Sequence, residues 1–137
     1  MNHIEALMTI PQIAKLLPTD AAMHACSVAG KFDGDDRICL VALLHDVVED
    51  KYATFEELKE RFNLDKEQMQ ALEAITRRDG EKYFDYIARV QLNDMATKVK
   101  LVDLQLNILR CAESLPNHWS LFERYYKAYK ILIGGYK

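Results

Sequence analysis

The stretch Leu43–Asp50, which reads LLHDVVED, decides how the rest of the chain is interpreted. It continues the apolar run that begins at Cys39, and a run of this kind predicts a buried helix. An imidazole and three carboxylates within six residues need partners there, because a buried charge is costly unless it is paired. A divalent metal ion is the simplest partner. The nitrogen of His45 and the oxygens of Asp46 form a mixed ligand set that suits Mn, Fe, Mg or Zn.

Helical spacing adds a second argument. His45 and Glu49 are four residues apart, as are Asp46 and Asp50, so each pair lies on roughly one helix face. One turn then holds the metal, and the next turn places a carboxylate over the open side of the metal. The alternative is a polar step that caps a helix at the surface, but the apolar flanks of the motif argue against it.

The composition predicts one compact domain covering residues 1–137, with enough apolar residues for a core. The net charge of −3 excludes a nucleic-acid binder that works by bulk positive charge. We expect no membrane segment, because no apolar run is long enough to span a bilayer. Three cysteines without C-x-x-C spacing predict reduced thiols, and together with the absence of a signal-peptide pattern they predict a cytoplasmic protein.

Apolar periodicity near 3.6 recurs along the chain, and strand-type alternation never persists, so the sequence predicts an all-α bundle of about six to eight helices. Capping boxes are predicted at Thr54-x-x-Glu57 and Asp65-x-x-Gln68. One or two short helices are expected between Ile4 and Leu17. The other predicted helices are Ala21–Lys31, Asp36–Val48, Thr54–Phe62, Asp65–Thr76, Tyr83–Val90, Asp94–Arg110 and Trp119–Ile133.

Two further polar residues stand out in apolar surroundings. Asp103 lies among leucines and valines, and it is either a ligand or the partner of Lys98 or Lys100. Asn107 follows one turn later on the same face, where it either contacts a ligand hydroxyl or holds Asp103 in place. His24, in the small and apolar segment AAMHACSVA, is either a core histidine bonded to a carbonyl or a third ligand.

The order of these residues resembles that of the HD-domain metal-dependent phosphohydrolases. VALLHDVVED (Val41–Asp50) resembles the HD box of RelA/SpoT-type alarmone hydrolases, including the trailing Glu-Asp. The stretch Thr54–Val90 resembles the one that follows the box in short single-domain relatives. ATKVKLVDLQLN (Ala96–Asn107) resembles their K-L-A-D-x-x-x-N segment, and MHACSVA (Met23–Ala29) resembles the segment that holds the first ligand.

The resemblance implies an HD-domain helical bundle that binds one Mn ion and removes the 3′-pyrophosphate from guanosine tetraphosphate-type alarmones. It implies that Glu49 and Asp50 orient or deprotonate the attacking water, and that Asn107 contacts the substrate ribose. The partner would be a small-molecule nucleotide, and the oligomeric state is open. The implied metal ligands are His24, His45, Asp46 and Asp103.

One segment departs from the alarmone hydrolases. The residues before the first histidine read IAKLLPTDAAMH (Ile13–His24) and lack the Arg-Lys pair and the G-x-P-Y sequence that help to hold the nucleotide. The metal site is therefore better supported than the guanosine substrate. Two alternatives remain: a nucleotidase or phosphohydrolase acting on other nucleotides, and a metal- or nucleotide-sensing module without turnover.

Phosphate charge calls for basic groups, and the sequence offers several. Arg77 and Arg78 next to Gly80 suit phosphate because guanidinium groups bind its oxygens in pairs, but they equally suit a solvated helix end. Tyr83 and Tyr86 either line a base pocket or pack in the core. The remaining phosphate-binding candidates are Lys82 and Lys98.

Overall fold

Helices make up the secondary structure of the computed structural model, which describes residues 11–12, 15–114 and 117–134. These ranges hold seven α-helices, a short 3₁₀ helix and no strand, so the all-α prediction is confirmed. Most of the predicted segment Ile4–Leu17 lies outside the described residues. The elements are α2 (Thr19–Ala29), η1 (Gly30–Phe32), α3 (Asp36–Leu44), α4 (Phe55–Phe62), α5 (Lys66–Ile75), α6 (Tyr83–Gln91), α7 (Asp94–Glu113) and α8 (Trp119–Gly134).

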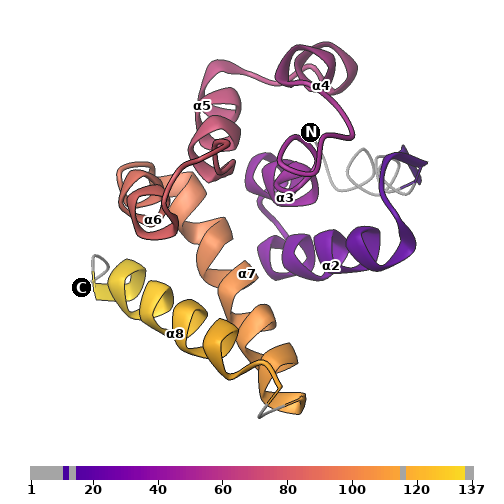
Figure 1. Cartoon of the computed structure of the whole chain (residues 1–137). Coiled ribbons are helices and arrows are strands. Elements are labelled where there is room, and N and C mark those ends of the chain that lie inside the picture. The colour runs from indigo at the N-terminus through magenta and orange to yellow at the C-terminus, as the bar shows by residue number, and fades with distance from the viewer. Residues whose placement is uncertain (1–10, 13–14, 115–116, 135–137) are drawn as a thin grey trace.

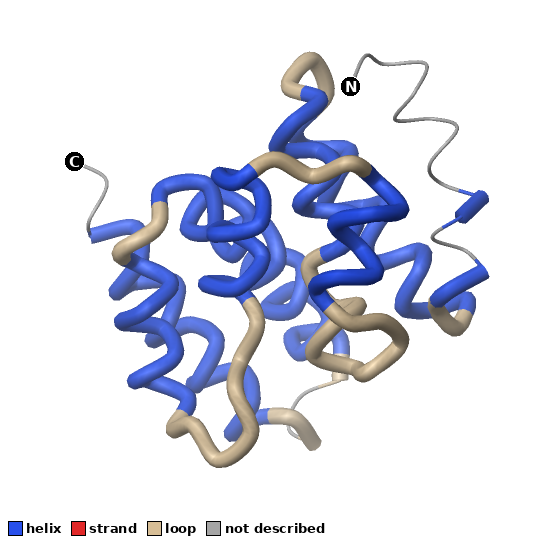
Figure 2. The backbone as a smooth tube through the Cα atoms, turned by 90° about the horizontal axis from the view of Figure 1, so that it is seen from above, coloured by secondary structure: helices blue, strands red, loops and turns tan. Residues whose placement is uncertain are grey.

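The longest helix, α7, runs through the middle of the bundle (Figure 1). It packs against α2, α3, α5, α6 and α8, and its residues Val99 and Leu104 are fully buried. Figure 2 shows the same arrangement from above, with helices joined by short loops and turns. Because α7 contacts helices from both halves of the chain, a polar residue on it can meet side chains that are distant in sequence.

The apolar run before His45 forms α3, and it is buried on all sides. Leu40, Val41, Ala42, Leu43 and Leu44 are each at most 2% exposed. The helix lies against α2, α5 and α7, so it has no solvent face along this stretch. This is why the sequence is continuously apolar rather than amphipathic.

α3 ends at Leu44, and the prediction that this helix continues to Val48 is wrong. The Nδ1–H group of His45 donates to the carbonyl oxygen of Ala42 at 2.6 Å, and the backbone N–H of Val47 donates to Leu44 at 3.1 Å. A side chain that donates a hydrogen bond to a backbone carbonyl competes with the regular backbone hydrogen bonds of the helix. The HD motif therefore lies in a turn at the end of a buried helix, where its side chains can face several directions.

Polar side chains define where several helices begin. Asp65 forms the predicted capping box with Gln68, in which each side chain accepts a hydrogen bond from the backbone N–H of the other residue. At the start of α4, Thr54 caps the helix as expected, but the Glu57 side chain contacts the Thr54 hydroxyl instead of its backbone. The residues whose side chains accept a hydrogen bond at an N-cap are Asp35, Thr54, Asp65 and Asn93.

Arg89 of α6 closes the end of α5 and holds the loop that follows it. Its guanidinium donates to the carbonyl oxygens of Glu73, Ala74 and Thr76 at 2.9, 3.2 and 2.8 Å. It also forms a two-point contact with the Glu81 carboxylate, with distances of 3.1 and 3.0 Å. The last carbonyls of a helix have no partner within the helix, so Arg89 satisfies groups that would otherwise be unpaired. The loop is thereby fixed at one edge of the molecule.

No helix within the described ranges has the length and apolar composition needed to cross a membrane. The three cysteines, Cys26, Cys39 and Cys111, are free thiols, as the sequence predicts. Burial raises the pKa of Cys26 and of Cys39, so both remain protonated at neutral pH. They act in the fold as small packing residues.

Replacing Arg89 tests whether its hydrogen bonds to the end of α5 and to Glu81 stabilise the fold. Arg89→Lys keeps the charge but cannot reproduce five donors in a planar arrangement, so we expect a loss of about 2–3 kcal/mol in the free energy of unfolding. The measurement is urea unfolding followed by circular dichroism. Arg37→Lys is the matched control, because Arg37 pairs with Asp65 and Glu67 at the surface, and this change should have little effect. Equal effects of the two variants would contradict the assignment.

The same contact makes a pH prediction. Hydrogen bonds from Arg89, with help from the backbone N–H of Arg78, lower the pKa of Glu81 from 4.5 to about 2. A carboxylate whose pKa is lower in the folded state stabilises that state fully above the unfolded value and loses this effect as the pH falls. Glu81→Gln should therefore be less stable than the wild type at pH 7, and the gap should close between pH 4.5 and about 2. Urea unfolding across this range measures it, and a constant gap would contradict the prediction.

Candidate metal centre

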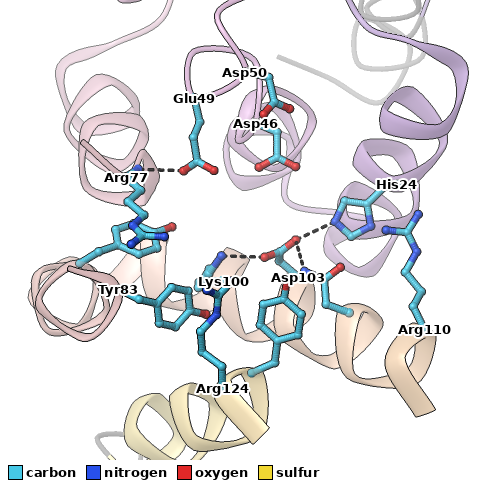
Figure 3. A pocket seen from close by; sticks show the side chains of 13 residues that line it. His24, Asp46, Glu49, Asp50, Arg77, Tyr83, Lys100, Asp103, Arg110 and Arg124 are labelled. Atoms are coloured by element: carbon cyan, nitrogen blue, oxygen red, sulfur yellow. Dashed lines mark hydrogen bonds and ion pairs between the residues drawn. The ribbon is translucent and has the colours of Figure 1, made fainter. Parts of the chain in front are cut away.

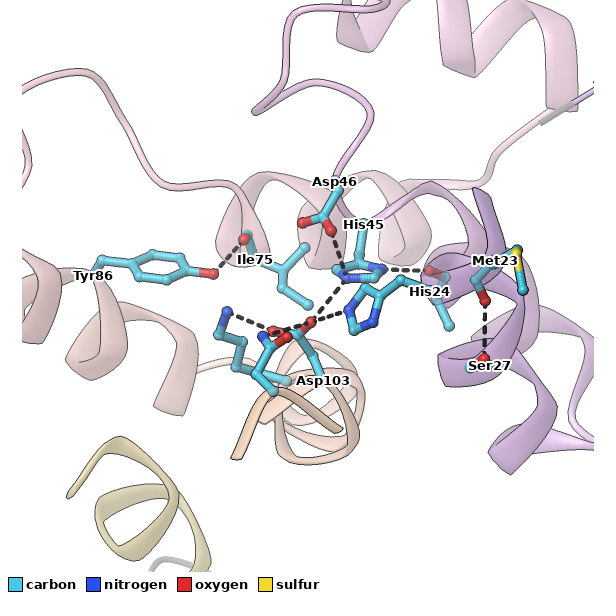
Figure 4. Close-up of polar contacts among 11 residues, drawn as sticks. Met23, His24, Ser27, His45, Asp46, Ile75, Tyr86 and Asp103 are labelled. Carbon is cyan, nitrogen blue, oxygen red and sulfur yellow. Dashed lines mark hydrogen bonds and ion pairs between the residues drawn. The ribbon is translucent and has the colours of Figure 1, made fainter. Parts of the chain in front are cut away.

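Four side chains from three parts of the chain meet at one point (Figure 4). His24 comes from α2, His45 and Asp46 come from the turn after α3, and Asp103 comes from α7. One potential ligand atom from each lies within 4.8 Å of the others. His24 and Asp103 are 79 positions apart in the sequence, so only the fold brings them together. These are the four residues predicted as ligands, and this buried His/Asp cluster could hold a metal ion.

Asp103 is the centre of the cluster and is only 3% exposed. Its Oδ1 atom accepts a hydrogen bond from His24 Nε2 at 2.6 Å and a longer one from Asn107 Nδ2 at 3.4 Å. Its Oδ2 atom accepts from Lys100 Nζ at 2.8 Å. Burial opposes ionisation, but Lys100 and the two histidines outweigh it and hold the pKa of Asp103 well below its usual range. Asp103 is thus both a member of the cluster and the ion-pair partner of Lys100, so the two interpretations of this residue are compatible.

The orientation of His45 is fixed by its hydrogen bond to Ala42. This bond places the proton on Nδ1 and directs Nε2 toward Asp46 and Asp103, at 3.2 and 3.3 Å from their oxygens. Burial lowers the pKa of His45, but Asp46 and Asp103 more than reverse this effect and raise it well above 6.5. Two carboxylates facing one ring nitrogen require a cation between them. A proton on Nε2 and a divalent ion therefore compete for the same place.

The cluster forms one side of a pocket of about 240 Å³. Figure 3 shows the acidic groups Asp46, Glu49 and Asp50 on one wall, facing Lys100 and Arg124 across the pocket. The acidic wall comes from the turn after α3, and the basic wall comes from α7 and α8. A ligand in this pocket meets the potential metal ligands, free carboxylates and basic groups at the same time.

Glu49 and Asp50 keep exposed side chains beside the cluster. The Oε1 atom of Glu49 accepts a hydrogen bond at 2.9 Å from the backbone N–H of Arg77, in the loop that Arg89 holds. Partial loss of water around each carboxyl raises the pKa of both, and the charge of Asp46 raises them further. A carboxylate with a raised pKa is a better proton acceptor, so this wall can assist in deprotonating a water molecule.

The predicted phosphate-binding residues divide into two groups. Arg77 lines the pocket, whereas Arg78, Lys82 and Lys98 do not. Asn107, predicted to contact the substrate ribose, also lines it. Lys98 is half-exposed and pairs with Asp94 at 3.2 Å, because five residues along a helix carry it away from the face of Asp103. Arg78 lines two adjoining hollows beside the same loop instead. Of these residues, Lys98 points away from the pocket, and Arg78 lies beside it in the loop after α5.

The tyrosines also divide. Tyr86 is 2% exposed and its hydroxyl donates to the carbonyl of Ile75, as expected of a core residue, although its edge reaches the pocket. Tyr83 is half-buried and lines the pocket. Sequence reasoning did not place Arg124 or Tyr125 of α8 there, because only the packing of α8 on α7 brings them in. The contact of Lys100 with Asp103 could be predicted from the sequence, because Lys100 lies three residues before Asp103 on the same helix face.

No family model matches the sequence, and no curated protein matches it at a significant level. The site provides two imidazoles and two carboxylates around one point, with further carboxylates and basic groups within the same pocket. The set suits a divalent ion that accepts both nitrogen and oxygen ligands.

Metal binding should release a proton from His45. We expect that affinity for Mn falls as the pH is lowered, because the imidazolium and the metal exclude each other. Isothermal titration calorimetry in two buffers with different ionisation enthalpies measures the proton directly. Substitutions outside the ligand shell typically lower metal affinity by roughly 10- to 100-fold. Asp46→Asn removes a candidate ligand itself, so its affinity for Mn should fall by more than this. Asp85→Asn, an exposed change on α6, is the control, and metal binding without proton release would contradict the arrangement.

Proposed function

We propose that this protein is a metal-dependent phosphohydrolase that acts on nucleotides, with Mn as the preferred ion and a nucleotide 3′-pyrophosphate of the guanosine tetraphosphate type as the first substrate to test. The observation that carries the proposal is the presence of the His/Asp cluster and the Glu49–Asp50 pair in one pocket. A site that only binds metal or senses a nucleotide has no need of two further carboxylates that do not belong to the cluster.

The charges of the pocket support an anionic substrate. Four carboxylates and four basic side chains line it, so these fixed charges balance. A divalent ion then leaves an excess of about two positive charges, which a phosphoryl group complements. The carboxylates are Asp46, Glu49, Asp50 and Asp103, and the basic residues are Arg77, Lys100, Arg110 and Arg124.

The residues have separable roles in hydrolysis. His24, His45, Asp46 and Asp103 would hold the divalent ion, which when bound would lower the pKa of water and polarise a phosphoryl oxygen. Asp50 accepts the proton of the attacking water, and Glu49, held by the Arg77 backbone, orients that water. Lys100 keeps Asp103 ionised, so that Asp103 remains a ligand. Asn107 supports the same carboxylate and presents its amide to the substrate.

A smaller nucleotide is the second candidate substrate. The pocket volume of about 240 Å³ lies below the common range for drug-sized ligands, roughly 300–1,000 Å³. The segment before His24 also lacks the residues that hold a guanine nucleotide in alarmone hydrolases. Both observations favour a nucleotidase or phosphohydrolase that recognises mainly the phosphate end of its substrate.

The test is release of phosphate and pyrophosphate from guanosine tetraphosphate and from a panel of ordinary nucleotides, with added Mn. Asp50→Asn should lower kcat by about 10²–10⁴-fold while metal affinity stays nearly unchanged, because Asp50 acts on the proton and does not belong to the cluster. Asp46→Ala should lose both metal and turnover. Asp85→Asn should behave as the wild type.

The outcomes separate the candidates. Pyrophosphate released from the alarmone alone supports the 3′-pyrophosphohydrolase. Turnover of other nucleotides alone keeps the phosphohydrolase and rejects the alarmone. Tight metal binding without turnover of any substrate rejects the enzyme in favour of a sensing module.

A further inference from the structure

Arg124 and Tyr83 form a part of the pocket wall that the proposed chemistry leaves unexplained. Arg124 extends from α8 into the pocket, beside Tyr83 of α6 (Figure 3). The guanidinium carbon lies 4.4 Å from the centre of the Tyr83 ring and 5.4 Å from that of Tyr125. Two aromatic rings thus hold the cation in place without using its hydrogen-bond donors.

Both residues present a buried polar atom that has no partner. Within the described part of the chain, Nε of Arg124 and the hydroxyl oxygen of Tyr83 are buried and make no hydrogen bond. A buried polar group without a partner is unfavourable, so a native site rarely keeps two of them side by side. Burial also raises the pKa of Tyr83, which keeps its hydroxyl protonated and available as a donor.

Two of the other basic residues of the pocket already have partners. Lys100 pairs with Asp103 at 2.8 Å, and Nε of Arg77 donates to the Glu81 carbonyl at 3.0 Å. No carboxylate among the described residues forms an ion pair with Arg124. Arg124 is therefore a half-buried cation that has no carboxylate partner in the described part of the chain and whose buried Nε has no hydrogen bond, whereas Lys100 is committed to Asp103. Guanidinium groups bind phosphate oxygens with two parallel hydrogen bonds.

We propose that Arg124 and Tyr83 form a second anion subsite, which holds a phosphoryl group adjacent to the one that is attacked. This inference rests on the proposed function for the identity of the attacked group. It makes the site selective for compounds with two linked phosphoryl groups over monoesters. The donors would be the guanidinium nitrogens of Arg124 and the hydroxyl of Tyr83, which line the pocket opposite Asp46.

The test is calorimetric binding of inorganic pyrophosphate and of orthophosphate to the full chain with Mn present. Wild type should prefer pyrophosphate. Arg124→Gln should weaken pyrophosphate binding by at least about tenfold and orthophosphate binding much less, since only the second phosphoryl group loses its charged donors. Tyr83→Phe should reduce the same preference by a smaller factor. Lys130→Gln, which removes one exposed charge from the same helix, should leave both affinities unchanged.

Arg124→Lys protects the test against a folding defect, because it keeps the charge and loses only the fork, and it should give an intermediate preference. Circular dichroism identifies any variant that does not fold. The subsite is overturned if wild type does not prefer pyrophosphate, or if Arg124→Gln weakens both anions equally or neither. If no nucleotide is hydrolysed but the Arg124-dependent preference persists, the proposed function fails and the subsite stands.

Discussion

A buried carboxylate needs hydrogen-bond donors, and the donors of Asp103 connect separate helices of this protein. Asp103 is almost inaccessible to water, and its donors come from three separate segments: His24 on α2, His45 after α3, and Lys100 on its own helix. Removing any one of them would leave a buried charge less well compensated, which is among the costlier changes a core can suffer. The packing of α2 and α3 against α7 is therefore tied to the same contacts that assemble the candidate metal centre.

The two walls of the pocket are set by different interactions. The acidic wall depends on the early end of α3, where His45 takes the Ala42 carbonyl and the chain turns. The loop behind Glu49 depends on Arg89, which holds the end of α5 and leaves the Arg77 N–H free to reach Glu49. The basic wall depends on α8 lying along α7. A substitution can thus disturb one wall while the other keeps its geometry.

The parts of the site that the sequence predicted share one property: a polar residue in an apolar context. His24, His45-Asp46 and Asp103 are polar residues among apolar neighbours, and the fold brings all of them to one point. The helices were readable for a similar reason, since apolar periodicity and side-chain caps such as Asp65 act locally.

The parts that were missed depend on contacts that no local pattern reveals. The end of α3 is set by a bond between an imidazole and a carbonyl, which periodicity cannot register. Lys98 is the exception, because its distance of five residues from Asp103 along α7 already placed it away from that face. Arg124 enters the pocket because α8 folds back on α7, and that packing has no signature near Arg124 itself.

The placement of the ligands along the chain has a consequence for how the protein is made. His24, His45 and Asp46 leave the ribosome well before Asp103, and a helix cannot pack until it has been synthesised. During that interval the nascent chain carries a partial ligand set without the carboxylate that orders it. The four groups can therefore converge only after α7 has been made, so any ion that this cluster holds would be bound at a late step of biogenesis.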